Sequence, residues 1–129
     1  MKILVVEDGE GARESLAYDL RRRGNEILTA QNGLEALSKY DDCKLDEAPV
    51  DLVITDINMP VMNGITLIQR LREEVGFRGG IVVASGERDI HFPKEWEVLT
   101  PRTFNPAGYL QAYENWKAEN SGKKQDESN

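Results

Sequence analysis

Short apolar runs rich in Val and Ile alternate along the chain with longer amphipathic stretches. Three of these runs end in a carboxylate or a hydroxyl group: Ile3–Asp8, Asp51–Asp56 and Ile81–Ser85. Apolar runs of this length are typical of strands that are buried on both faces of a parallel sheet. Two further short strands are predicted over Glu26–Ala30 and Val98–Leu99.

Amphipathic helices are predicted between these strands, because apolar residues recur there at spacings of three and four. The helices are expected over Glu10–Arg23, after Asn32-Gly33, near Ile65, and from Pro106 behind an Asn105 N-cap. The apolar positions that mark the first three helices are Ala12, Leu16, Leu20, Leu34, Leu37, Tyr40, Ile65, Leu67, Ile68 and Leu71. In the last helix Leu110, Tyr113 and Trp116 are expected to face the core.

The alternation of strands and helices predicts an α/β fold with a doubly wound, five-stranded parallel sheet. Residues 41–49 are predicted to form a polar connection, and Pro93 prevents a long helix before the last strand. Residues 119–129 lack apolar side chains, which predicts a disordered tail behind a single domain over residues 1–118.

The composition of the 129-residue chain excludes some partners. It has 16 basic and 23 acidic residues, a net charge of −7, which argues against binding to nucleic acid or to an anionic membrane surface. The lone Cys43 allows no internal disulfide, the first apolar run is too short for a signal peptide, and no stretch is long enough to span a membrane. A cytoplasmic location is therefore expected.

The polar residues that end the predicted strands form a candidate site. In an open α/β sheet all the carboxyl ends of parallel strands lie along one edge, and ligands bind there. Glu7, Asp8, Asp56 and Ser85 are therefore expected to gather in one crevice. Three carboxylates so close together repel one another unless a cation lies between them, and this predicts a Mg²⁺ site.

Four segments carry a resemblance to a known family. They are ILVVED (3–8), DLVITDINMPVMNG (51–64), VVASG (82–86) and, less closely, PRTF (101–104). The chain resembles the receiver domains of response regulators in bacterial two-component signalling, over about residues 2–118. The long segment that contains Asp56 is the specific part of this resemblance.

The resemblance implies a flavodoxin-like sheet of order 2-1-3-4-5 and assigns a role to each site residue. Asp56 would be the phosphoacceptor, and Asp8, Asp56 and the backbone carbonyl of Asn58 would bind Mg²⁺ directly. Glu7 would act on the metal through water, and Ser85 would donate a hydrogen bond to the phosphoryl group and move with it. The donor would be a histidine kinase or a histidine phosphotransfer protein, and the signal would pass to a downstream protein of unknown identity.

The chain departs from the family after the fourth strand. An ungapped count from Phe104 places Arg102 where the family has a lysine that pairs with the phosphoryl group. Another alignment sets Thr100-Pro101 there and leaves no cation. Leu99 stands where the family has a mobile Tyr or Phe. The interval from Ser85 to Arg102 is short, which predicts a shortened or irregular fourth helix.

Three functions are compatible with these patterns. The leading hypothesis is a stand-alone receiver that catalyses its own phosphorylation and dephosphorylation but is not otherwise an enzyme. The second is a degenerate receiver that binds proteins without phosphate control, which the changes at Leu99 and Arg102 favour. The third is a Mg²⁺-dependent phosphohydrolase with an aspartyl-phosphate intermediate. Such haloacid-dehalogenase-like enzymes need a DxD pattern after the first strand, and Glu7–Glu10 has none.

Overall fold

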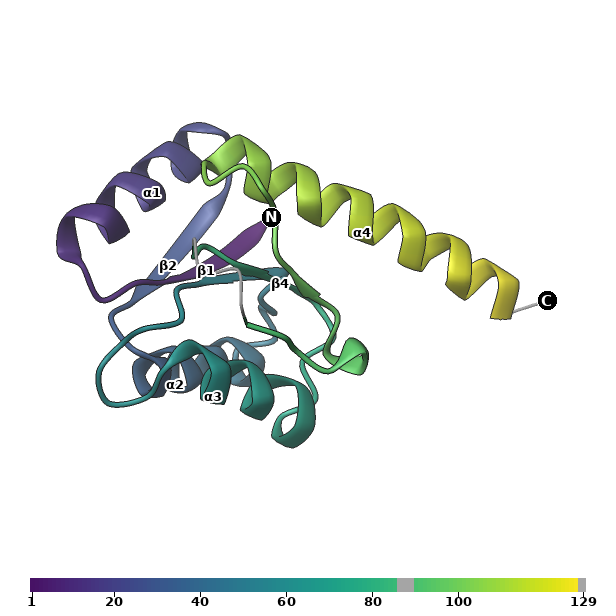
Figure 1. Ribbon diagram of the computed structural model, residues 1–129, viewed down its shortest axis with the longest axis horizontal. Coiled ribbons are helices and arrows are strands. Elements are labelled where there is room, and N and C mark those ends of the chain that lie inside the picture. Colours follow the sequence, from purple (N-terminus) through teal and green to yellow (C-terminus); the bar gives the residue numbers. More distant parts are fainter. Residues whose placement is uncertain (86–89, 128–129) are drawn as a thin grey trace.

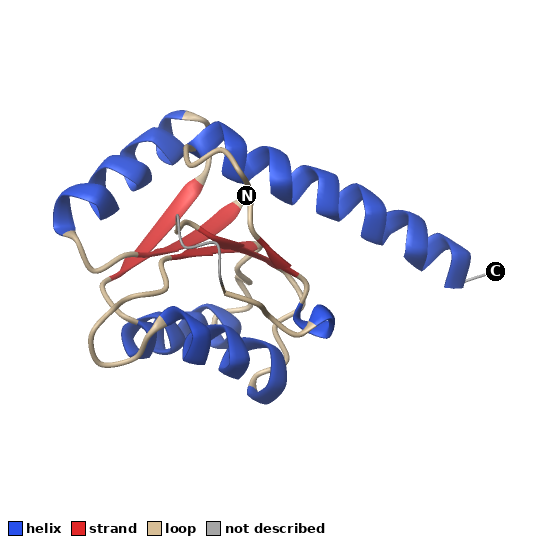
Figure 2. Cartoon of the chain, in the orientation of Figure 1, coloured by secondary structure: helices blue, strands red, loops and turns tan. Residues whose placement is uncertain are grey.

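The computed structural model describes residues 1–85 and 90–127, with residues 122–127 described by their backbone. Its centre is a parallel sheet of five strands in the order β2-β1-β3-β4-β5, as predicted (Figure 2). The strands are β1 (Lys2–Val6), β2 (Glu26–Ala30), β3 (Leu52–Thr55), β4 (Gly80–Val83) and β5 (Val98–Leu99).

Helices cover both faces of this sheet (Figure 1). On one face lie α1 (Glu10–Arg22) and α4 (Pro106–Glu127), and on the other lie α2 (Gly33–Leu45) and α3 (Gly64–Gln69). A π-helical turn, η1 (Arg70–Glu74), continues α3. This arrangement confirms the doubly wound, flavodoxin-like fold.

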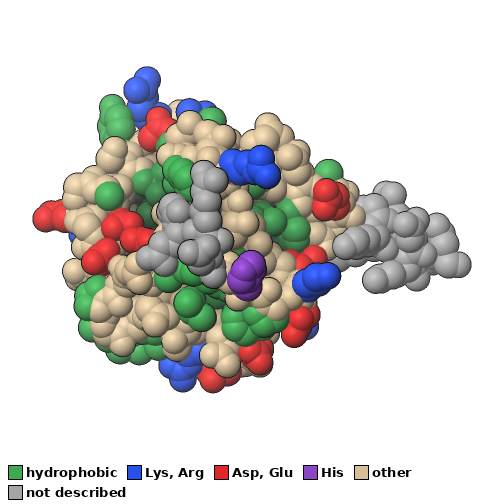
Figure 3. Space-filling view, in the orientation of Figure 1, with side chains coloured by type: hydrophobic (Ala, Val, Ile, Leu, Met, Phe, Trp, Pro, Cys, Tyr) green, Lys and Arg blue, Asp and Glu red, His purple; other side chains and the backbone are tan. Residues whose placement is uncertain are grey.

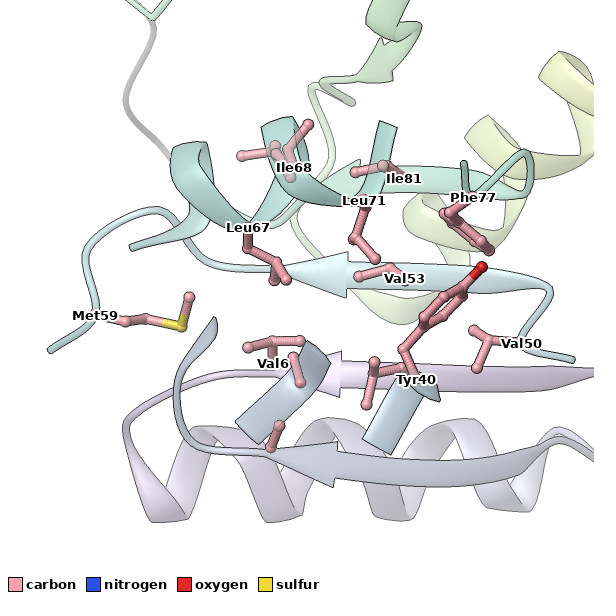
Figure 4. Packing of buried hydrophobic residues seen from close by; sticks show 14 of the residues in the cluster. Val6, Tyr40, Val50, Val53, Met59, Leu67, Ile68, Leu71, Phe77 and Ile81 are labelled. Atoms are coloured by element: carbon pink, nitrogen blue, oxygen red, sulfur yellow. The ribbon is translucent and has the colours of Figure 1, made fainter. Parts of the chain in front are cut away.

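The core consists of two apolar layers, one on each side of the sheet. The layer under α2 and α3 contains Val6, Val53 and Ile81 from the strands together with Leu67 and Leu71 from the helical side (Figure 4). The layer under α1 and α4 is formed by the alternate strand residues, with side chains from both helices. Because β1, β3 and β4 are buried on both faces, their sequences are apolar apart from Lys2 at the start of β1 and Thr55 at the end of β3.

Two details of the predicted helices were wrong. The segment predicted as a polar connection from residue 41 is helical as far as Leu45, because Tyr40 and Cys43 are buried one turn apart and keep α2 on the sheet. Ala12 is exposed, and Leu34 is 53% exposed. In these two helices Ala17 and Ala36 are the fully buried small residues, since helices pack closely on a sheet where side chains are small.

The end of the chain also differs from the prediction, since α4 continues to Glu127 where a disordered tail was expected from residue 119. The residues after Trp116 are mostly Lys, Glu, Gln, Asn and Ala, and several of these have high helix propensity. Figure 1 shows that this half of α4 extends beyond the sheet. None of the helices in the described ranges is both long and apolar enough to cross a membrane.

Outside residues 86–89, the segment between β4 and β5 is irregular, as predicted. In its described part, which excludes residues 86–89, the single helical element is the 3₁₀ turn η2 (Lys94–Trp96). Arg72 of η1 joins this segment to the turn before β4: its guanidinium donates to the carbonyl of Trp96 at 2.7 Å and to those of Phe77 and Gly79, before β4, at 2.8 Å. The Arg72 side chain thus bonds to the connection between β4 and β5, where a βαβ unit has a helix.

Candidate functional site

The sheet register aligns the ends of the central strands. The backbone N–H of Asp56 donates to the carbonyl of Val6 at 3.0 Å, and that of Ala84 donates to the carbonyl of Thr55 at 2.9 Å. These bonds continue the β1–β3 and β3–β4 ladders by one residue. The first residues after β1, β3 and β4 therefore lie side by side at one edge of the sheet.

Glu7, Asp8 and Asp56 form an acidic cluster at this edge. One carboxylate oxygen from each residue lies within 4.8 Å of the other two. Glu7 and Asp56 are half-buried and Asp8 is exposed, so the cluster is open to solvent on one side. Figure 3 shows acidic side chains gathered on the side of the molecule where β1 leads into α1. The three carboxylates that were predicted to meet at the strand ends, those of Glu7, Asp8 and Asp56, therefore do lie together.

Short-range hydrogen bonds fix the orientation of two of the carboxylates. Asp56 Oδ1 accepts from the N–H of Ile57 at 2.7 Å, and Glu7 Oε1 accepts from the N–H of Gly9 at 3.0 Å. Gly64, the first residue of α3, packs so closely on the Asp56 backbone that a Cβ atom would clash with its carbonyl oxygen. The glycine in this loop thus allows α3 to begin directly beside the acceptor strand.

Arg13 is a residue of this site that the sequence reasoning missed. Its Nη1 donates to the backbone carbonyl of Glu7 at 2.9 Å, and this bond ties the first turns of α1 to the end of β1. The side chain therefore holds the loop that carries two of the three carboxylates. A spacing of six residues across a strand-to-helix loop gives no periodic signal, so only the folded loop reveals this role.

The environment of Glu7 favours its protonated form. Burial raises the pKa of the Glu7 carboxyl above 4.5, and the nearby charge of Asp56 raises it further, while the hydrogen bond from Gly9 acts in the opposite direction. This is the expected result of placing carboxylates together without a cation. Repulsion among the carboxylates therefore lowers the stability of the cation-free protein, and a bound cation would offset this loss.

The donor set of the cluster fits magnesium. Mg²⁺ takes oxygen ligands at about 2.0–2.1 Å in an octahedron, so opposite ligands lie about 4 Å apart. Three carboxylate oxygens that are mutually within 4.8 Å are close to this separation. The exposed side of Asp8 leaves room for the several waters that Mg²⁺ retains.

The other predicted site residues lie around the cluster in different environments. Ser85 is half-buried two residues beyond the end of β4, beside the acceptor strand, and Asn58 is exposed two residues after Asp56. Arg102 is exposed and forms no ion pair with any described carboxylate. Leu99 is half-buried in β5. The roles of these residues remain predictions.

A groove of about 500 Å³ runs beside the cluster, between α1 and the start of α4. Its lining includes Glu7, Leu16, Tyr18, Ala84, Phe104 and Tyr109. Tyr109 is 6% exposed and was not among the predicted core residues of the last helix. The spacing of Tyr109, Tyr113 and Trp116, at four and three residues, is the signal that could have identified it.

The chain belongs to the response regulator receiver domain family, whose family model matches residues 3–96. The match includes the whole acidic cluster and ends before β5 and Arg102. Membership in this family confirms the resemblance seen in the sequence. It places the chain among the receiver domains of two-component signalling.

Individual relatives support this assignment. The chain is 39% identical over 79 residues to the chemotaxis protein CheY1 of Helicobacter pylori, and the matched segment spans 60% of each protein. It resembles the receiver domain of the hybrid histidine kinase CckA with a TM-score of 0.70 and 29% identity, over 89% of this chain and 97% of that one. A chain in the CheX–CheY–BeF₃–Mg²⁺ complex of Borrelia burgdorferi matches with a TM-score of 0.66 and 25% identity, over 87% of this chain and 85% of that one.

Proposed function

We propose that this protein is a phosphoacceptor receiver in which Asp56 accepts a phosphoryl group in a Mg²⁺-dependent reaction. The observation that carries the proposal is the acidic cluster, with carboxylate oxygens of Glu7, Asp8 and Asp56 within 4.8 Å of one another at the carboxyl edge of the sheet. Asp56 follows the central strand β3 and is the candidate nucleophile, since carboxylates can form acyl phosphates.

In this reaction an oxygen of Asp56 attacks the phosphorus of a phosphohistidine while the P–N bond breaks. The imidazole leaves and recovers a proton from solvent, and an aspartyl phosphate remains. The hydrogen bond from the Ile57 N–H to Oδ1 orients the carboxylate, so that its other oxygen is available to attack.

Asp8, Asp56 and the carbonyl of Asn58 would hold Mg²⁺ directly, and Glu7 would do so through water. The ion would neutralise the negative charge on the transferring phosphoryl oxygens. Ser85 would donate a hydrogen bond to a phosphoryl oxygen, and Arg102 is the candidate cation for the same group. Its guanidinium would have to approach from solvent, because it is exposed in the free protein.

The donor would be a histidine kinase or a histidine phosphotransfer protein, and the output would be a change in protein contacts. The receiver domain of the hybrid kinase CckA and the CheX–CheY–BeF₃–Mg²⁺ complex support this class of partner and this metal. The chain spans 60% of the length of CheY1, so the activity and partners of that whole protein do not transfer directly.

A degenerate receiver that binds proteins without phosphate control is the second candidate. It is favoured by the end of the family match at residue 96, before the segment with Leu99 and Arg102. The presence of all three carboxylates argues for the phosphoacceptor function, because their mutual repulsion would be uncompensated in a module that binds no cation.

The test is incubation with acetyl phosphate and Mg²⁺, followed by intact mass spectrometry. We expect the wild type to gain one phosphoryl group, Asp56→Asn to gain none, and chelation of Mg²⁺ to prevent the reaction. Asp42→Asn, which removes an exposed carboxylate on α2, is the matched control and should react like the wild type. A wild type that stays unmodified would favour the degenerate receiver.

A further inference from the structure

Tyr109 connects the acidic cluster to the last helix. It lies in the first turns of α4, is 6% exposed, and lines the groove that also contains Glu7 and Ala84. Glu7 is the first residue after β1, and Ala84 is the first residue after β4, beside the acceptor strand. The phenol is thus the group that α4 presents beside the candidate phosphoacceptor.

The charge around Tyr109 suits a hydrogen-bond donor. Burial raises the pKa of its phenol, and the carboxylates of Asp56 and Glu7 raise it further. The hydroxyl therefore keeps its proton at neutral pH. A protonated hydroxyl beside anionic groups is poised to donate to them, directly or through water.

The same helix face continues away from the site. Tyr113 and Trp116 follow at helical spacing, with ring centroids 6.0 Å apart. Tyr113 packs on Gly80 at the start of β4, where a Cβ atom would lie 2.5 Å from its Cδ1 atom. Beyond this contact α4 extends past the sheet (Figure 1). A shift at Tyr109 would therefore be passed along a helix that extends beyond the sheet.

We propose that Tyr109 is a positioning residue that couples the state of Asp56 to the position of α4. Its hydroxyl donates to the acidic site, and phosphorylation of Asp56 changes that interaction and displaces the start of the helix. The inference rests on the proposed phosphoacceptor function. Through Tyr109 the phosphorylation state could affect α4 without an aromatic residue at position 99. This position is occupied by Leu99, which has neither a ring nor a hydroxyl group.

The test compares Tyr109→Phe with Tyr113→Phe, a matched control that removes the hydroxyl of an equally buried tyrosine on the same helix. Tyr113 faces Asp51 at the opposite end of β3. Both substitutions keep the ring, so packing is retained. Each variant is made in a Trp96→Phe background, so that Trp116 is the one tryptophan reporter. Phosphorylation by acetyl phosphate is quantified by intact mass, and the fluorescence and indole NMR shift of Trp116 are recorded.

The response of Trp116 is expressed per phosphorylated molecule. We expect Tyr109→Phe to lose more than about half of the response and Tyr113→Phe to keep it, since a shift in position needs a differential interaction. A response that is equal to the wild type in both variants, or equally reduced in both, would overturn the role of Tyr109. Failure of the wild type to gain a phosphoryl group would instead overturn the proposed function, and this inference with it.

Discussion

The acidic cluster and the segment between β4 and β5 are held in different ways. The cluster follows strands whose ladders continue to its first residues, and its carboxylates accept backbone N–H bonds from Gly9 and Ile57. The segment after β4 has a single 3₁₀ turn in its described part. It accepts a hydrogen bond from Arg72, and half-buried apolar side chains such as Phe92 pack on the core. The geometry of the acidic cluster is therefore set by the register of the sheet. The segment after β4 is held by contacts of individual side chains.

The largest effect is expected from Arg72→Leu, which would sharpen this comparison. It removes three hydrogen bonds to carbonyls from a charged donor, so unfolding free energy should fall by about 3 kcal/mol, measured by urea denaturation. The pKa of Arg72 is lowered to about 10 by burial, so the group is still charged at neutral pH.

Arg70→Leu is the matched control for Arg72. Arg70 pairs with Glu74 at 2.8 Å on a partly exposed helix surface, and its loss should cost less than about 1 kcal/mol. Equal destabilisation by the two substitutions would show that Arg72 does not anchor the segment.

A smaller effect is expected from Glu7→Gln, which tests the cost of the acidic cluster. The raised pKa of Glu7 means that the folded chain holds this proton more tightly than the unfolded chain. The stability contributed by Glu7 is therefore complete below its ordinary pKa and falls as the pH rises through the raised value. At pH 7 without Mg²⁺ the variant should be more stable than the wild type by up to about 1 kcal/mol.

The gain from Glu7→Gln should disappear near pH 4, where the wild-type carboxyl is protonated. Thermal unfolding at the two pH values in EDTA measures this difference. Glu10→Gln, which removes an exposed carboxylate from the first turn of α1, should give no such gain. A loss of stability in Glu7→Gln at pH 7 would show that the cluster is not under electrostatic strain.

The sequence predicted most where the signal is local. The strands Glu26–Ala30 and Val98–Leu99 have the predicted bounds, and the cap at Asn105 is present, because apolar runs and caps act over a few residues. The three carboxylates could be placed together since parallel strands end at one edge. This inference uses only the order and direction of the strands and requires no knowledge of side-chain contacts.

The contacts that the sequence did not predict join residues from separate elements. The bonds of Arg72 to Trp96 and of Arg13 to Glu7 depend on how loops fold back on helices. Tyr109 was not among the positions predicted to face the core, and its place beside Glu7 depends on how α4 packs. The helical extension of α2 depended on burial of Cys43, which only the sheet provides.

In the proposed function the acidic cluster carries the reaction and Arg102 has a secondary role. The rate of phosphorylation by acetyl phosphate at saturating Mg²⁺ in Asp8→Asn and Arg102→Gln tests it most directly. Loss of the exposed but clustered Asp8 carboxylate should slow the reaction by at least about tenfold, whereas loss of the exposed Arg102 should slow it by less than about tenfold. An Arg102→Gln variant that does not react, beside an Asp8→Asn variant that reacts at the wild-type rate, would contradict this account.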